Sequence, residues 1–347
     1  DFRLKIVDPV LVGRHNMRKV ALVSLAAAAV FALGSTSALA DGRNPGSLLV
    51  FPIFDSTSGV ATVVTVTNTN SDFSFNEQTG LANGTVDVEY IYIDGESCRE
   101  FNRVERLTPN DTLSVVVGSH NAEMTIGYLY VFAKHTQTGV PITFNWLIGN
   151  EISVNGIETF EYGVNPWVYN GVPAEGEATD LDDDGILDLD GAEYEESPAE
   201  LLFPRFFGQS GLFNSELIML NLTGGVQFLA SVDFLIYNDN EYQFSAEYEF
   251  YCWARVPLLN ISGAFGQTFL ASTDDDDDEL VGLPSIETGW FRIDGAVASS
   301  TAVTLDDPTI LAVLIESVAA FAASDLPFEV GKQDNGDLLP RSVHGDS

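Results

Sequence analysis

The sequence predicts an all-β protein made of two tandem, internally duplicated antiparallel β-sandwich domains. Short segments rich in Val, Ile, Thr, Tyr and Phe alternate with clusters of Asn, Gly, Asp and Ser, as expected of half-buried strands. In addition, a series of landmarks in residues 48–144 returns in the same order in residues 201–311. An ordered series of this kind favours a tandem duplication with loop insertions over chance similarity.

Each landmark matches one position of the first half to one of the second. We therefore expect the two halves to superpose, with Phe51 over Phe203, Val86 over Val232 and Gly127 over Gly289. The matched segments are Leu48–Phe54 with Leu201–Phe206, Val64–Asn68 with Leu217–Asn221, Val86–Val88 with Val232–Phe234, Cys98 with Cys252, Gly127–Leu129 with Gly289–Phe291, and Pro141–Phe144 with Pro308–Leu311.

Each half is expected to hold seven short strands, which is typical of an immunoglobulin-like sandwich. The two halves look like the sandwich repeats of bacterial secreted and surface proteins, a resemblance that concerns the fold and implies no function. The expected strands are residues 48–54, 60–68, 85–93, 99–106, 112–117, 126–134 and 140–148, then 200–207, 214–222, 228–237, 247–256, 265–271, 287–293 and 308–316.

The last of these strands competes with a helix. Asp306 and Asp307 ahead of Pro308 are typical of a helix start. The repeat instead predicts a strand, because this segment corresponds to the strand expected at 140–148. We expect a strand through Ile315, followed by a short helical turn in residues 317–323.

The N-terminal region has the pattern of a bacterial secretory signal peptide. Met17-Arg18-Lys19 is positively charged, Val20–Leu33 is apolar, and Ala38-Leu39-Ala40 is a small-residue cleavage site. The protein is therefore expected to be secreted, in the periplasm, at the cell surface or outside the cell, with no transmembrane segment in the mature chain. The expected organisation is an upstream non-native leader (1–16), the signal peptide (17–40), the first repeat (41–170), an acidic linker (171–199), the second repeat (200–330) and a disordered tail (331–347).

The chain is strongly acidic, with 51 Asp and Glu against 15 Lys and Arg and a net charge of −36. A surface of this charge repels nucleic acid, so a nucleic-acid partner is not expected. Only Lys134 and Lys332 remain as lysines after the signal peptide, which also suits a saline habitat. Binding of divalent cations and adaptation to salt both explain the acidic excess, and the two are compatible.

The best-defined motif lies in the linker, where residues 180–188 read D-L-D-D-D-G-I-L-D. This spacing resembles the calcium loops of EF-hand, dockerin and thrombospondin type 3 repeats, in which alternate carboxylates, a turn glycine and a backbone carbonyl surround one ion. Gly191 stands where such loops carry a closing Glu, so Asp190 or Glu193 must supply that oxygen. The alternative is a solvated acidic linker. The expected calcium ligands are Asp180, Asp182, Asp184, Ile186, Asp188, Asp190 and Glu193.

Cys98 and Cys252 are the only cysteines, and the repeat places them at matching positions. In an exported protein a single pair favours a disulfide. Packing of the halves about a pseudo-twofold axis would bring equivalent positions together. The alternative is that each cysteine is a small buried core residue.

Signals for catalysis are weak, since after the signal peptide the only histidines are His120, His135 and His344. Trp167 and Tyr169 lie in loop-like sequence next to the calcium motif, where exposed rings can stack on a sugar or a partner. The other tryptophans are expected in the core. We therefore expect a secreted, non-enzymatic binding or surface-structural protein with calcium, polysaccharide or a cell-surface protein as partner. The alternative is a secreted hydrolase or lectin-like module acting on polysaccharide.

Overall fold

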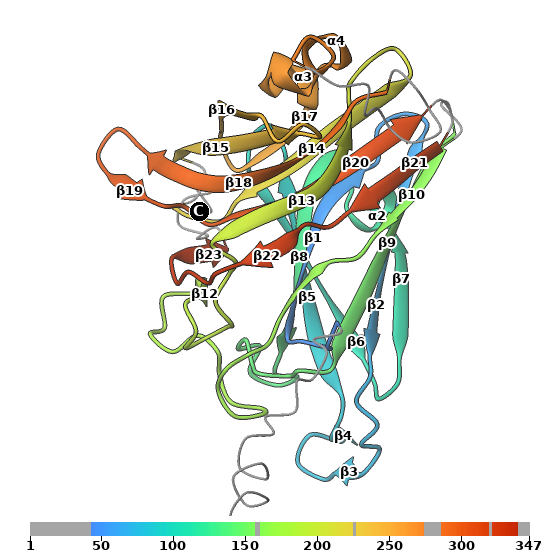
Figure 1. Cartoon of the computed structure of the whole chain (residues 1–347). Coiled ribbons are helices and arrows are strands. Elements are labelled where there is room, and N and C mark those ends of the chain that lie inside the picture. Colours follow the sequence, from blue (N-terminus) through green and yellow to red (C-terminus); the bar gives the residue numbers. More distant parts are fainter. Residues whose placement is uncertain (1–42, 157–159, 225–226, 274–285, 319–320, 339–347) are drawn as a thin grey trace, which may run out of the picture. The chain divides into compact units, whose positions relative to one another are not determined.

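The chain forms an all-β structure of several antiparallel sheets (Figure 1). The computed structural model describes residues 43–156, 160–224, 227–273, 286–318 and 321–338. The expected leader and signal peptide lie outside the described residues. Among the residues described, no helix has both the length and the apolar character to cross a membrane.

The first half holds two sheets. One has the strand order β11 (Trp167–Tyr169), β1 (Leu48–Asp55), β8 (Ile126–Lys134), β5 (Val86–Asp94), β6 (Glu100–Leu107). The other has the order β10 (Phe160–Val164), β9 (Leu147–Asn155), β2 (Val60–Asn68), β7 (Thr112–Val116). Helix α2 (Val117–His120) follows β7, and β3 (Phe75–Asn76) and β4 (Leu81–Ala82) form a small hairpin.

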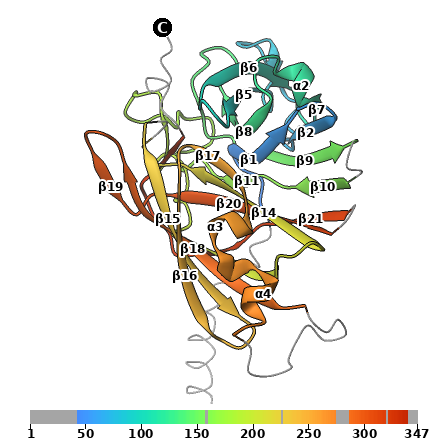
Figure 2. The same cartoon turned by 90° about the horizontal axis from the view of Figure 1, so that it is seen from above.

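The second half repeats both sheets strand by strand. Its first sheet has the order β22 (Phe328–Val330), β13 (Glu200–Phe207), β18 (Thr288–Ser299), β15 (Leu229–Asn238), β16 (Gln243–Phe250), with β19 (Thr304–Asp306) added to β18. Its second sheet has the order β21 (Phe321–Asp325), β20 (Ile310–Val318), β14 (Phe213–Asn221), β17 (Trp253–Pro257). Figure 2 shows the strands of the two halves as two groups.

The register of the first sheets confirms two of the matched pairs. Phe51 faces Leu129 as Phe203 faces Phe291, and each strand then has a β-bulge before the next paired residue. After the bulge Phe54 faces Gly127, as Phe206 faces Gly289. A Cβ atom at Gly127 would lie 1.9 Å from the Ile93 carbonyl oxygen, so the close approach of the neighbouring strand requires glycine.

The match of Val86 with Val232 is wrong by two residues. Asp94 faces Gly127 and Asn238 faces Gly289, which places Val88, and not Val86, at the position of Val232. Alternating valines in residues 86–88 made the two registers indistinguishable in the sequence.

The cysteines also do not occupy equivalent positions. Cys98 lies in the turn between β5 and β6, whereas Cys252 lies between β16 and β17. The left-handed turn position of Cys98 (φ 54°) is taken in the second half by Glu241 (φ 64°). Cys98 and Cys252 nevertheless form a disulfide, with their Cα atoms 6.2 Å apart, so their pairing arises from the packing of the two halves and not from a symmetry between them.

Some expected strands end elsewhere. The strand expected at 140–148 begins only at Leu147, because Pro141 has no amide hydrogen and the Thr143 amide donates to the Glu177 carbonyl instead of to a neighbouring strand. The strand expected at 247–256 is divided into β16 and β17. The one expected at 265–271 is helical, consisting of the end of η1 (Gly263–Phe265) and α4 (Gln267–Leu270), after α3 (Leu258–Ile261).

The C-terminal region contains more strand than expected. Ser317 and Val318 belong to β20 and residues 321–325 to β21, so the described part of the expected helical turn is extended. The tail expected to be disordered from residue 331 instead contains β23 (Gly336–Leu338), which pairs with β12 (Leu187–Leu189) in the linker. Residues 339–347 lie outside the described part of the chain.

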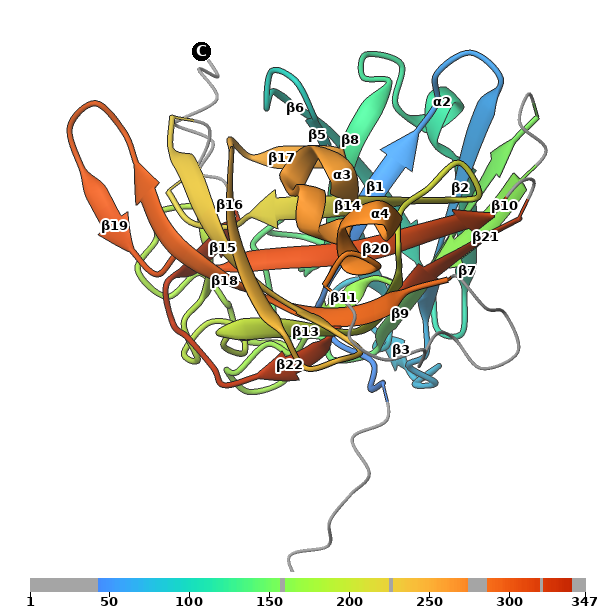
Figure 3. The same cartoon turned by 45° about the horizontal axis from the view of Figure 1, so that its top comes forward.

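The two halves share a hydrophobic core. Leu48 and Val50 on β1 belong to the same buried cluster as Ile218 and Leu220 on β14, all with no exposed surface. The indole nitrogen of Trp253 donates to the Pro52 carbonyl across this contact (3.0 Å). Strands β10 and β21 also lie side by side (Figure 3). The described residues from Pro45 onward therefore belong to one compact unit.

Candidate metal centre

The linker folds into a tight loop that its own carboxylates stabilise. Asp183 and Gly185 have left-handed backbone conformations, with φ of 61° and 80°. Asp180 accepts a hydrogen bond from the Gly185 amide (3.2 Å), and Asp184 accepts one from the Ile186 amide (2.8 Å). These hydrogen bonds from backbone amides to Asp side chains stabilise the tight turns of the loop, as in Asx turns.

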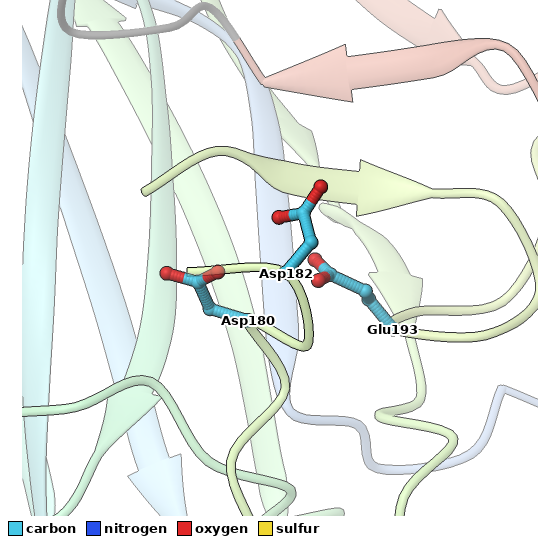
Figure 4. Close-up of side chains that lie close together, drawn as sticks. All are labelled: Asp180, Asp182 and Glu193. Carbon is cyan, nitrogen blue, oxygen red and sulfur yellow. The ribbon is translucent and has the colours of Figure 1, made fainter. Parts of the chain in front are cut away.

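The loop brings carboxylates together in two overlapping sets. One set is Asp180, Asp182 and Glu193, and the other is Asp182, Asp184 and Asp188. In each set one oxygen per residue lies within 4.8 Å of the others, and Asp182 is common to both. Figure 4 shows Glu193 extending toward the loop that carries Asp180 and Asp182.

Glu193 closes the loop, and Asp190 does not. The Glu193 side chain is buried and accepts hydrogen bonds from the amides of Leu181 (2.5 Å) and Asp188 (3.2 Å). Asp190 instead accepts from the amides of Ala192 (2.8 Å) and Glu193 (2.9 Å), which fixes the turn that presents Glu193. Of the two residues that the sequence offered for the closing position, the structure brings Glu193 to the cluster.

The cluster concentrates negative charge without a basic partner. No ion pair among the described residues involves these carboxylates. Burial and then the neighbouring aspartates raise the pKa of Asp188 to about 6. Burial raises the pKa of Glu193 to about 7, although two backbone hydrogen bonds oppose the shift. One oxygen of Asp180 is shielded from solvent and has no hydrogen-bond partner among the described residues. Each of these features is a cost that a bound cation would offset.

Asp337 is a neighbour of the cluster that the sequence did not indicate. It lies on β23 directly opposite Asp188 on β12. Burial raises its pKa to about 7, and Asp188 and Asp184 add to the shift. One of its oxygens accepts from the Gly224 amide (3.2 Å), and the other is buried without a partner among the described residues. The sequence did not predict this proximity, because Asp337 is far from the loop along the chain and lies in a segment that was expected to be disordered.

The proposed aromatic platform is wrong. Trp167 and Tyr169 are only 7% and 4% exposed, because β11 joins the edge of the first sheet beside β1. The Tyr169 hydroxyl lies 3.2 Å from the Ser197 hydroxyl inside the protein. Trp146, expected in the core, is instead 41% exposed. The sequence context misled in both cases, because the loop-like sequence around Trp167 forms a buried edge strand and the apolar sequence around Trp146 leaves its ring partly exposed.

The histidines have local roles. His120 is buried, with its ring nitrogens 2.8 Å from the Tyr92 hydroxyl and 3.3 Å from a Glu105 carboxylate oxygen. His135 accepts hydrogen bonds from the amides of Gln137 and Thr138 in a surface turn. Residues 274–279, a run of five Asp followed by Glu, lie outside the described residues.

No protein-family model, no curated protein and no solved structure matches this chain.

Proposed function

We propose that the protein is a secreted, non-enzymatic binding or surface-structural protein in which bound calcium stabilises the joint between two immunoglobulin-like sandwiches. The observation that carries the proposal is the convergence of Glu193 with Asp180 and Asp182, which supplies the closing carboxylate that the loop sequence lacks at its usual position. The matching strand orders of the two halves support the two-sandwich interpretation.

The ligand set favours calcium. Carboxylate oxygens suit hard cations, and calcium accepts six to eight oxygens in flexible geometry. Neither set contains a His or Cys, the ligands that zinc prefers. Asp190 acts by holding the turn. The proposed ligands are Asp180, Asp182, Asp184, Asp188 and Glu193, with the Ile186 carbonyl.

The position of the loop explains how calcium would couple the halves. The Val172 amide, which follows the first half, donates to the Glu193 carbonyl (2.9 Å). Strand β12, which carries Asp188 of the loop, pairs with β23, whose Asp337 amide donates to the Leu222 carbonyl of the second half. A cation that binds only the ordered loop stabilises it by RT ln(1 + [L]/Kd), about 2.7 kcal/mol at a hundredfold excess over Kd.

Calorimetry of the dialysed full-length chain tests the proposal. Saturable heat at micromolar to millimolar calcium, lost in Asp182→Ala, is the expected result, because Asp182 belongs to both carboxylate sets. Absence of saturable heat at millimolar calcium, or equal binding by the variant, would contradict the proposal. The loop would then be an acidic linker, and adaptation to salt would be the better explanation of the negative charge.

A second candidate function is lectin-like binding of polysaccharide. It is favoured by a polar pocket whose wall includes Glu175, the hydrogen-bond partner of the exposed Trp146.

A further inference from the structure

A pocket of about 280 Å³ opens between the β3–β4 hairpin, residues 135–144 and residues 175–176. Amide, carboxylate, imidazole and apolar side chains line it. Its lining residues include Asn70, Asp72, Asn83, His135, Phe144 and Glu175.

We propose that this pocket binds a neutral sugar unit of a polysaccharide. The proposal deepens the binding role given above and rests on it. Amides and carboxylates are groups that hydrogen-bond to sugar hydroxyls, and an apolar surface such as Ile142 and Phe144 suits the C–H face of a sugar ring. The described lining has no Lys or Arg and includes Asp72 and Glu175, so an acidic sugar would be repelled.

Trp146 provides a stacking surface beside the pocket. Its indole N–H donates to a Glu175 carboxylate oxygen (3.0 Å), which fixes the ring next to the pocket wall. The Trp146 backbone carbonyl accepts from both the amide (2.8 Å) and the hydroxyl (2.7 Å) of Thr69, which directly precedes the lining residue Asn70. The Glu175 bond therefore holds the partly exposed ring, and the Thr69 bonds hold the backbone that carries it. A held aromatic ring can stack on a sugar at little entropic cost.

Hydrogen bonds within residues 70–85 also order this part of the pocket wall without a ligand. The Asn70 side chain accepts from the Asp72 amide (2.8 Å), and the Asp72 side chain accepts from the Ser74 amide (2.9 Å). Thr85 also lines the pocket, and its hydroxyl oxygen is buried without a hydrogen-bond partner among the described residues.

The pocket wall is continuous with the calcium loop. The Gly176 amide donates to the Thr143 carbonyl (2.8 Å), the Thr143 amide donates to the Glu177 carbonyl (2.9 Å), and the Thr179 amide donates to the Pro141 carbonyl (3.1 Å). Asp180, the first carboxylate of the loop, follows directly. Ordering of the loop therefore fixes the segment that carries Glu175, and calcium should strengthen sugar binding.

Calorimetry of the full-length chain with cellohexaose, laminarihexaose, mannohexaose and an alginate hexamer tests the proposal at millimolar calcium. We expect binding of at least one neutral hexamer and none of alginate. Trp146→Ala and Glu175→Ala should each weaken binding about tenfold or more, because they remove the stacking ring and the group that holds it. Phe328→Ala is the matched control, since Phe328 is an exposed aromatic residue on β22, which the pocket does not include.

Several outcomes would overturn the proposal. These are no binding of any neutral hexamer, binding of alginate equal to that of the neutral sugars, or an equal loss in Phe328→Ala and Trp146→Ala. Release of reducing ends from the bound hexamer would show a hydrolase instead of a binding site. Calcium binding without sugar binding would overturn this inference alone. If the chain shows no heat of calcium binding and still binds sugar equally with and without calcium, the proposed calcium site fails and the proposed sugar pocket stands.

Discussion

Glu151 in the first half and Leu314 in the second half occupy the same position in the fold. Glu151 faces Val64 across β9 and β2, as Leu314 faces Leu217 across β20 and β14. Neither Glu151 nor Leu314 has exposed surface. Both carboxylate oxygens of Glu151 lack a hydrogen-bond partner among the described residues, and burial raises its pKa well above the usual value. The first half therefore buries an unpartnered acid where the second half buries a leucine.

We predict that Glu151→Leu stabilises the protein at neutral pH. A buried polar group without a partner costs about 1–3 kcal/mol, and the substitution removes it. Because burial raises the folded pKa of Glu151 above its unfolded value, the folded state holds the Glu151 proton more tightly than the unfolded chain does. The stability of the wild-type protein therefore falls as the pH rises. The gain in Glu151→Leu, measured by denaturant unfolding, should therefore increase with pH. Glu151→Gln, which cannot ionise, should flatten the same pH dependence, and a destabilised Glu151→Leu would contradict the prediction.

Loss of the Cys98–Cys252 disulfide should destabilise the protein by up to about 5 kcal/mol, because the bridge closes a very long loop and limits the unfolded chain. Denaturant unfolding of Cys98→Ser and Cys252→Ser should give similar midpoints, both below that of the oxidised protein. The reduced wild type is the control and should match the variants. Two reactive thiols in unfolded, unreduced protein would show that no bridge forms.

We expect Glu193→Gln to weaken calcium binding more than Asp190→Asn. Glu193 belongs to a carboxylate set, whereas Asp190 accepts hydrogen bonds that an Asn oxygen can also accept. Loss of a charged ligand should lower the affinity about tenfold or more in Glu193→Gln, with a smaller change in Asp190→Asn. Calorimetric titration of the two variants side by side makes the comparison. Equal losses would assign the closing position to both residues.

Without calcium the stability should fall as the pH rises from about 4 to about 7. The folded pKa of Asp337 is about 7 against an ordinary 3.8, so the folded state retains a proton that the unfolded chain has lost over this range. The raised pKa values of Asp188 and Glu193 act in the same direction. Melting temperatures in a chelator across this pH range measure the effect, and Asp337→Asn should reduce the slope. A melting temperature that rises with pH in the chelator would contradict the raised pKa values of Asp337, Asp188 and Glu193.

Local sequence determined most of the strands and the turn of the acidic loop at residues 180–188. Enrichment in β-branched and aromatic residues between turn-forming clusters is a local property of the sequence, so β2 and β8 begin and end where the pattern predicts. The equivalence of Gly127 and Gly289, which lie opposite the bulges, was also predicted from the sequence. A close backbone contact at that position excludes a side chain, so glycine is required in both halves. The spacing of acids around Gly185 likewise fixes a turn within a few residues.

Only the tertiary structure decided which face of each strand is covered and which distant residues meet. Alternation does not show whether the second face of a strand is solvated, so the exposure of Trp146 and the burial of Trp167 were not predictable. Matching cysteine positions suggested symmetry, but the disulfide joins inequivalent turns because the two halves bury different faces against each other. Asp337 lies opposite Asp188 for the same physical reason: long-range strand pairing depends on the packing of the whole chain, which no local pattern encodes.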